Sequence, residues 1–134
     1  MNIVYATDDN GALGTGVSIV SLMENLPPGV HADIYIMTDG LNEDNTARLN
    51  SLQRSYRLSL HFIDMKDKYT DFPVGSKWSA ATYYRLGLAG ELPATVERAL
   101  YVDTDTIFNR DISPMYESEF GDCPIAGVFT TEDL

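Results

Sequence analysis

The chain alternates short apolar runs with segments of helical periodicity, and this alternation limits the folds that it can adopt. The apolar runs at residues 3–6, 32–37, 58–65, 99–102 and 125–129 have the length of strands. Three segments between them have helical spacing: residues 17–26, a segment capped by Asn42 or Asn45 that runs to about Tyr56, and residues 79–88. Strands joined by helices predict an α/β fold with a mostly parallel sheet.

Length and composition favour one domain and exclude several classes of protein. The 134 residues are enough for a single domain with its own core. No run reaches the ~20 apolar residues of a membrane helix, so no transmembrane segment is expected, and the first residues do not resemble a signal peptide. The single cysteine, Cys123, forms no intrachain disulfide, which favours a cytoplasmic location. Because it precedes an apolar run, we expect Cys123 to be packed and inert.

The charge of the chain restricts its ligands. The formal net charge is −11, from 20 acidic and 9 basic residues. Such a surface repels phosphate backbones, so we expect no nucleic-acid partner. An anionic ligand of any kind would need a bound cation or a well-placed Arg or Lys.

Polar clusters follow three of the expected strands. Residues 8–10 follow the first strand, Thr38 and Asp39 follow the second, and residues 103–105 follow the fourth. In parallel α/β sheets, ligands bind at the carboxyl ends of the strands. The sequence therefore places a candidate site at this edge of the sheet.

Asp103 and Asp105 form an Asp-x-Asp pair directly after the fourth strand. In an extended chain, residues two apart share a face, with Cα atoms roughly 6–7 Å apart. A hard divalent cation relieves the repulsion between two such carboxylates and leaves positions for phosphate oxygens and water. The tripeptide alone is weak evidence in so acidic a chain, but its place after an apolar strand favours a metal site.

Two other interpretations of this segment are weaker. Residues 102–106 resemble the Asp-x-Asp-x-Thr motif of haloacid-dehalogenase-like phosphatases, in which Asp103 would be a nucleophile and Asp105 an acid/base. That family carries the motif on its first strand and needs a downstream Lys, and no Lys follows Asp105 in this chain. An EF-hand loop is disfavoured because Ile107 and Phe108 occupy positions that need a polar ligand and Gly.

Three segments together resemble glycosyltransferase family 8, which includes bacterial lipopolysaccharide galactosyl- and glucosyltransferases and the glycogenins. They are residues 2–10 (NIVYATDDN) with 17–22 (VSIVSL), residues 79–86 (SAATYYRL), and residues 100–106 (LYVDTDT) with the later pairs 111–112 and 121–122. The resemblance covers almost the whole chain in the family's order.

The resemblance implies a GT-A fold, a Rossmann-like sheet, in which residues 1–134 form one nucleotide-sugar-binding domain that is incomplete at its C-terminus. It implies Mn²⁺ or Mg²⁺ as cofactor and transfer, with retention, of a hexose from a UDP-sugar to a saccharide or lipid-linked acceptor, as in lipopolysaccharide biosynthesis. It also assigns residues to roles: Ala6, Thr7, Asp8 and Asn10 to the uracil and ribose, Arg85 to the sugar nucleotide, Asp103 and Asp105 to the metal, and Thr104 to the ribose.

The chain departs from the family in two respects. Gly11 stands where the family has an aromatic residue, and Gly14 and Gly16 predict a pliable loop before the first helix. Family members are also considerably longer, and their third metal ligand and catalytic residues lie in the additional part; neither His31 nor His61 matches that ligand. We therefore expect the isolated chain to bind UDP weakly if at all and to transfer little.

Two further expectations follow from an incomplete fold. A non-catalytic binding or interaction module is the alternative to an enzyme. A sheet face left open by the shorter chain is expected to be apolar, which would favour a homo-oligomer.

Overall fold

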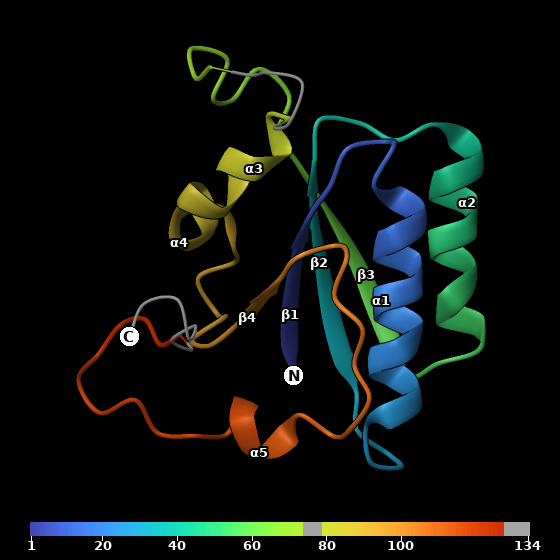
Figure 1. Ribbon diagram of the computed structural model, residues 1–134, viewed down its shortest axis with the longest axis vertical. Coiled ribbons are helices and arrows are strands. Elements are labelled where there is room, and N and C mark those ends of the chain that lie inside the picture. The colour runs from blue at the N-terminus through green and yellow to red at the C-terminus, as the bar shows by residue number, and fades with distance from the viewer. Residues whose placement is uncertain (74–78, 128–134) are drawn as a thin grey trace.

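The computed structural model of the chain describes residues 1–73 and 79–127, and within them it contains one four-stranded parallel sheet (Figure 1). The strands are β1 (Asn2–Ala6), β2 (Ala32–Thr38), β3 (Leu58–Asp64) and β4 (Leu100–Val102). Their spatial order is β3-β2-β1-β4, and every neighbouring pair is parallel. The predicted α/β class and these four strands are confirmed.

Strand β1 lies in the middle of the sheet because its side chains are apolar on both faces. Ile3, Val4 and Tyr5 are fully buried, as is typical of parallel strands covered on both sides. Tyr5 is in register with Ile36 of β2 and Val102 of β4. The chain therefore leaves β1, β2 and β4 at the same edge of the sheet.

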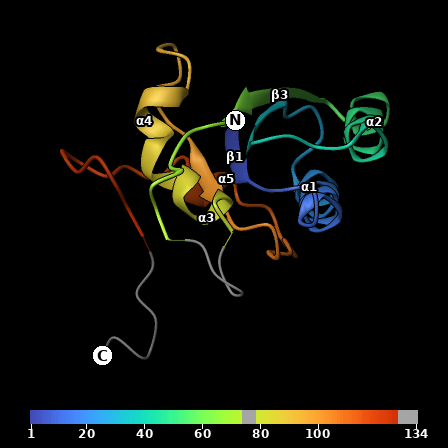
Figure 2. The ribbon, with the colours of Figure 1, turned by 90° about the horizontal axis from the view of Figure 1, so that it is seen from above.

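Helices α1 (Ala12–Asn25) and α2 (Glu43–Ser51) cover one face of the sheet (Figures 1 and 2). Asn42 caps α2, since its side-chain oxygen accepts a hydrogen bond from the Asn45 backbone N–H at 2.8 Å. A short 3₁₀ turn (Leu52–Arg54) continues α2 toward β3. The apolar face of α1, which includes Ile19 and Leu22, packs on the sheet.

Helix α1 begins five residues earlier than predicted, so the expected pliable glycine loop is wrong. Gly14 and Gly16 lie inside the helix. A Cβ atom on Gly14 would be 3.0 Å from the backbone oxygen of Thr104, and one on Gly16 would be 3.6 Å from the Leu49 side chain. These glycines allow α1 to pack closely against the β4 loop and α2, a tertiary reason that local sequence does not reveal.

The opposite face of the sheet is covered near its carboxyl edge by α3 (Ala81–Tyr84), a 3₁₀ turn (Arg85–Gly87) and α4 (Leu88–Glu91). The sequence predicts one helix over residues 79–88, and the structure divides it into these three pieces. The predicted inward face is confirmed: Ala81 and Tyr84 are buried, and Ala80 and Leu88 pack beside them.

The strand predicted at residues 125–129 is wrong in its described part, and residues 128–129 lie outside the described residues. Helix α5 (Ser113–Tyr116) is followed by an exposed stretch at residues 117–127, in which Ile125 is 84% exposed. Cys123 is exposed as well, contrary to the expected packed thiol. The apolar run of residues 125–127 pairs with no described strand, and so Cys123 is not buried by it.

The sheet face that carries α3 and α4 is polar toward the amino ends of the strands. His61 Nε2 lies 3.0 Å from Asp33 Oδ1, and Ser59 Oγ lies 3.1 Å from the His31 ring. The expectation of an apolar open face is therefore wrong at this end of the sheet. Among residues 1–73 and 79–127, no helix has both the length and the apolar character that crossing a bilayer requires.

Candidate functional site

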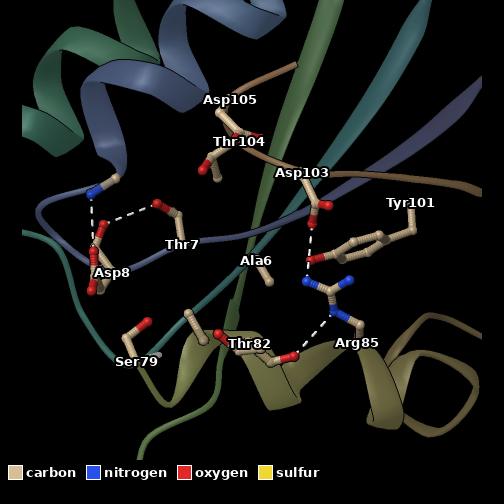
Figure 3. Close-up of a pocket in the computed structure, with 12 residues that line it drawn as sticks. Ala6, Thr7, Asp8, Ser79, Thr82, Arg85, Tyr101, Asp103, Thr104 and Asp105 are labelled. Atoms are coloured by element: carbon tan, nitrogen blue, oxygen red, sulfur yellow. Dashed lines mark hydrogen bonds and ion pairs between the residues drawn. The ribbon is translucent and has the colours of Figure 1, made fainter. Parts of the chain in front are cut away.

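An open cavity of about 490 Å³ lies at the carboxyl edge of the sheet, between the segments that follow β1 and β4 and the segment that contains α3 (Figure 3). Its volume is within the range of small-molecule sites. The residues that line it come from three separate segments and include seven of the eight that the sequence indicated: Ala6, Thr7, Asp8, Gly11, Ser79, Ala81, Thr82, Arg85, Tyr101, Asp103, Thr104 and Asp105.

The segment after β1 holds a carboxylate at the rim of the cavity. Thr7 is buried, and its backbone N–H donates to the Met37 oxygen at 3.0 Å, which extends the β1–β2 ladder. The Thr7 hydroxyl donates to the Asp8 backbone oxygen at 3.0 Å, and the Gly11 N–H donates to Asp8 Oδ1 at 2.9 Å. These bonds fix the Asp8 side chain beside the cavity.

The segment after β4 makes a turn instead of continuing as an extended strand. The Thr106 N–H donates to the Asp103 backbone oxygen at 3.1 Å and closes that turn. The spacing expected for an extended Asp103–Asp105 pair therefore does not apply. Both carboxylates line the cavity, but in Figure 3 the Asp103 side chain points toward Arg85, whereas Asp105 lies on the other side of Thr104.

Arg85 reaches the site from the 3₁₀ turn after α3. Its Nε donates to the Thr82 backbone oxygen at 3.1 Å, and its Nη2 donates to Asp103 Oδ1 at 3.0 Å. The guanidinium lies over the Tyr101 ring, 4.8 Å from its centroid. Arg85 thus supplies positive charge inside an otherwise acidic cavity, and it is held there by three groups.

Tyr101 forms the floor under Arg85 and stays protonated at neutral pH. Burial raises the pKa of Tyr101 to about 12, Arg85 opposes this shift, and Asp103 adds to it. Its hydroxyl is therefore a neutral hydrogen-bonding group next to Asp103.

Some lining residues escape prediction from the sequence, and one expected residue lies elsewhere. Asn10 is exposed and is not among the residues that line the cavity. Tyr101 could have been found, because it lies two residues before Asp103 near the same strand end. Ser79 and Thr82 lie in the segment of residues 79–86 that carries the resemblance, but the sequence assigns neither of them a role. Lys77 and Trp78, which precede the segment of Arg85 and have side chains that could reach a phosphate or stack on a ring, lie outside the described residues.

The cavity offers two carboxylates to a cation. Among residues 1–73 and 79–127, no group of three or more His, Cys, Asp or Glu side chains is placed to hold a metal ion. Asp103 and Asp105 are hard oxygen donors of the kind that Mg²⁺ and Mn²⁺ take, usually alongside phosphate and water oxygens. They fit a cation shared with a ligand better than one enclosed by protein. The two histidines lie by Asp33 and do not line the cavity.

Comparison with known proteins gives a consistent result. The family model described as glycosyl transferase family 8 matches residues 2–133. A lipopolysaccharide 1,2-glucosyltransferase of Escherichia coli K12 is 34% identical over 117 residues, which cover 86% of this chain and 34% of that protein. A lipopolysaccharide 1,3-galactosyltransferase of Salmonella typhimurium is 28% identical and covers 99% of this chain and 40% of its own length.

A crystal structure of the galactosyltransferase LgtC in complex with donor and acceptor sugar analogues superposes with a TM-score of 0.81 at 28% identity. The match covers 91% of this chain and 44% of that one. The chain thus spans less than half the length of each of these relatives.

Proposed function

The chain belongs to glycosyltransferase family 8, and we propose that its cavity binds the UDP part of a UDP-hexose donor. Its parallel sheet with helices on both faces is the GT-A fold, as the resemblance predicted. The transferase that contains this domain would pass the hexose, with retention, to a saccharide or lipid-linked acceptor. The lipopolysaccharide transferases among its relatives support an acceptor of that kind.

One observation carries this proposal: the segment after β1, the turn after β4 and Arg85 meet at one cavity, although they are far apart in the sequence. Ala6, Thr7 and Asp8 present backbone groups and a carboxylate that suit the polar edge of uracil and the ribose hydroxyls. Asp103 and Asp105 flank Thr104, which would lie against the ribose. We assign Asn10 to the outer rim of the nucleoside site, since it is exposed.

The diphosphate needs positive charge in a chain of net charge −11. Mn²⁺ or Mg²⁺, held by Asp103 and Asp105, would neutralise the diphosphate and stabilise UDP as it departs. Arg85 would then orient the donor with its planar guanidinium, which suits phosphate and hydroxyl oxygens. We place this reaction in the cytoplasm, which is the location that the sequence favours.

Paramagnetic NMR tests the proposal and detects weak binding. Mn²⁺ added to the ¹⁵N-labelled chain with UDP is expected to broaden the amide signals of residues 103–106 and 7–8. Mg²⁺ with UDP should shift the same signals, and UDP without a divalent cation should shift them much less. Asp103→Ala and Asp105→Ala should each abolish the broadening.

Asp44→Ala is the matched control, because Asp44 is an exposed carboxylate on α2 that pairs with Arg48. In this variant, Mn²⁺ with UDP should broaden the amide signals of residues 103–106 and 7–8 as it does in the unchanged chain. Broadening centred away from residues 103–106, or UDP binding that is equally strong without a cation, would refute the proposal.

A non-catalytic binding module is the second candidate, and one contact favours it. Arg85 already occupies Asp103 Oδ1, so the carboxylate pair is partly neutralised without a cation. This candidate predicts no change in the NMR signals of residues 7–8 and 103–106 at millimolar UDP, with or without Mn²⁺.

A further inference from the structure

Asp9 makes a dense set of hydrogen bonds to the start of α2, although it follows Asp8 at the cavity rim. Its Oδ1 accepts from the Asn42 backbone N–H at 2.8 Å and from Asn45 Nδ2 at 2.9 Å, and its Oδ2 accepts from Asn42 Nδ2 at 2.7 Å. Asn45 Nδ2 also donates to the Asp9 backbone oxygen at 3.1 Å. These bonds join residues more than thirty positions apart in the sequence.

The orientation of the Asn42 amide is fixed by two partners at once. Its oxygen accepts from the Asn45 N–H and caps α2, while its nitrogen donates to Asp9 Oδ2. If the amide turned over, it would place its NH₂ group against the Asn45 N–H, two donors facing each other. An acceptor at position 9 therefore favours the capping orientation of Asn42, and the Asp9 carboxylate supplies that acceptor.

We propose that Asp9 is a positioning residue for the nucleotide site, acting through Asn42 and Asn45. The inference rests on the proposed function above. Asp8 and Asp9 have different roles. Asp8 lines the cavity, and Asp9 connects the loop that carries Asp8 to the start of α2 through hydrogen bonds.

The consequence for binding follows from the cost of ordering a loop. The backbone groups of Ala6, Thr7 and Asp8 can recognise a nucleoside only if the loop keeps one conformation. A loop that is ordered before the ligand arrives avoids that cost during binding. The hydrogen bonds hold the pKa of Asp9 below its ordinary value, the Asn42 backbone N–H having the largest effect, so the carboxylate stays charged at neutral pH.

An exchange of the side chains at positions 9 and 42 tests the inference. Asp9→Asn alone sets a second NH₂ group against that of Asn42 and should loosen the loop. Asn42→Asp alone sets two carboxylates against each other and should loosen it as well. The double variant keeps the net charge of the unchanged chain. In it, the new amide at position 9 donates to the new carboxylate at position 42, which still caps α2 because Asp and Asn are equally good caps. The double variant should recover most of the loop order that each single variant loses.

Two measurements are needed. The first is hydrogen exchange of the Gly11 amide, which donates to Asp8 and reports loop order without a nucleotide; it should exchange roughly tenfold faster in each single variant. The second is the Kd for UDP with Mg²⁺, which should rise roughly tenfold in the single variants and return in the double variant.

Leu52→Ala is the matched control, since Leu52 packs against the core at the end of α2, whereas the hydrogen bonds to Asp9 come from Asn42 and Asn45. It should lower Tm at least as much as Asp9→Asn and leave Gly11 exchange and the Kd close to those of the unchanged chain. Equal effects of Leu52→Ala and Asp9→Asn on the Kd would reduce Asp9 to a purely structural role and overturn the inference.

The inference and the proposed function fail separately. If the unchanged chain does not bind UDP, the proposed function fails, and slower or unaltered Gly11 exchange in Asp9→Asn would still refute the loop-ordering role. If UDP binds but the double variant recovers neither measurement, the inference fails and the proposed function stands.

Discussion

Arg85 Nη2 donates a hydrogen bond to Asp103 Oδ1 at 3.0 Å, and the same guanidinium lies 4.8 Å from the centre of the Tyr101 ring. Both charged side chains are about half exposed, at 42% and 55%. Pairs of this kind are worth little in free energy, because water screens them and ordering them costs entropy. The Asp103 carboxylate is therefore held in place by Arg85 but remains available to another cation.

This pair predicts that Arg85→Ala raises the affinity of the chain for Mn²⁺ when no nucleotide is present. Arg85 and a cation compete for the same carboxylate oxygen, so removing the guanidinium removes a competitor and a repelling charge. The expected gain is at most about fivefold, the size of an exposed ion pair. Titration calorimetry with Mn²⁺ measures it.

Arg48→Ala is the control for this measurement, because it also removes one Arg from an exposed ion pair, with Asp44 at 2.9 Å on α2. It should leave the Mn²⁺ affinity unchanged. An unchanged or weaker affinity in Arg85→Ala would show that the guanidinium does not compete with a cation at Asp103.

The two glycines inside α1 are expected to respond in opposite ways to Ala. Gly16→Ala should stabilise the protein by up to ~1 kcal/mol, since its Cβ would make an ordinary 3.6 Å contact with Leu49 and Ala favours helix. In Gly14→Ala the Cβ would be 3.0 Å from the Thr104 oxygen, so the turn that carries Asp103 and Asp105 must shift.

Thermal unfolding and Mn²⁺ titration separate the two glycine variants. Gly14→Ala should lose the helix-propensity gain and weaken Mn²⁺ binding several-fold, roughly as a loss of ~1 kcal/mol would. Equal gains in Tm with equal Mn²⁺ affinity in both variants would contradict a close α1–turn contact.

The exposed thiol of Cys123 predicts rapid labelling of the native protein. Because the side chain is accessible, a thiol reagent such as DTNB should react with one equivalent under native conditions, about as fast as after unfolding. Cys123→Ser should abolish the reaction and leave Tm unchanged. Labelling that needs denaturant would mean that the thiol is covered in solution.

Features that depend on neighbouring residues could be predicted from the sequence. The strand at residues 3–6 is predictable because it is apolar throughout, and the cap at Asn42 is predictable because capping is a local interaction. The site could be placed at the sheet edge because three polar clusters follow three strands of one parallel sheet.

Features that depend on distant contacts could not be predicted. The start of α1 is not evident in the sequence because Gly14 is explained only by Thr104, ninety residues later in the chain. The turn at Asp103 is closed by the hydrogen bond from the Thr106 N–H to the Asp103 oxygen, which an apolar strand pattern does not predict. The sequence around Asp9 indicates only an ordinary turn, since nothing near it points to its partners on α2.

Acid should release the contact between Asp9 and α2 only at low pH. The hydrogen bonds from the Asn42 backbone N–H and the Asn45 amide lower the pKa of Asp9 in the folded state below 3.8, its ordinary value. A carboxyl group whose pKa falls on folding contributes stability above its unfolded pKa and loses that contribution as the pH drops through its folded pKa. The difference in Tm between the unchanged chain and Asp9→Asn should therefore stay constant from about pH 7 to about pH 5 and shrink below pH 3.8. Differential scanning calorimetry across this range measures it, and a difference that already disappears above about pH 5 would mean that Asp9 is not held by these bonds in solution.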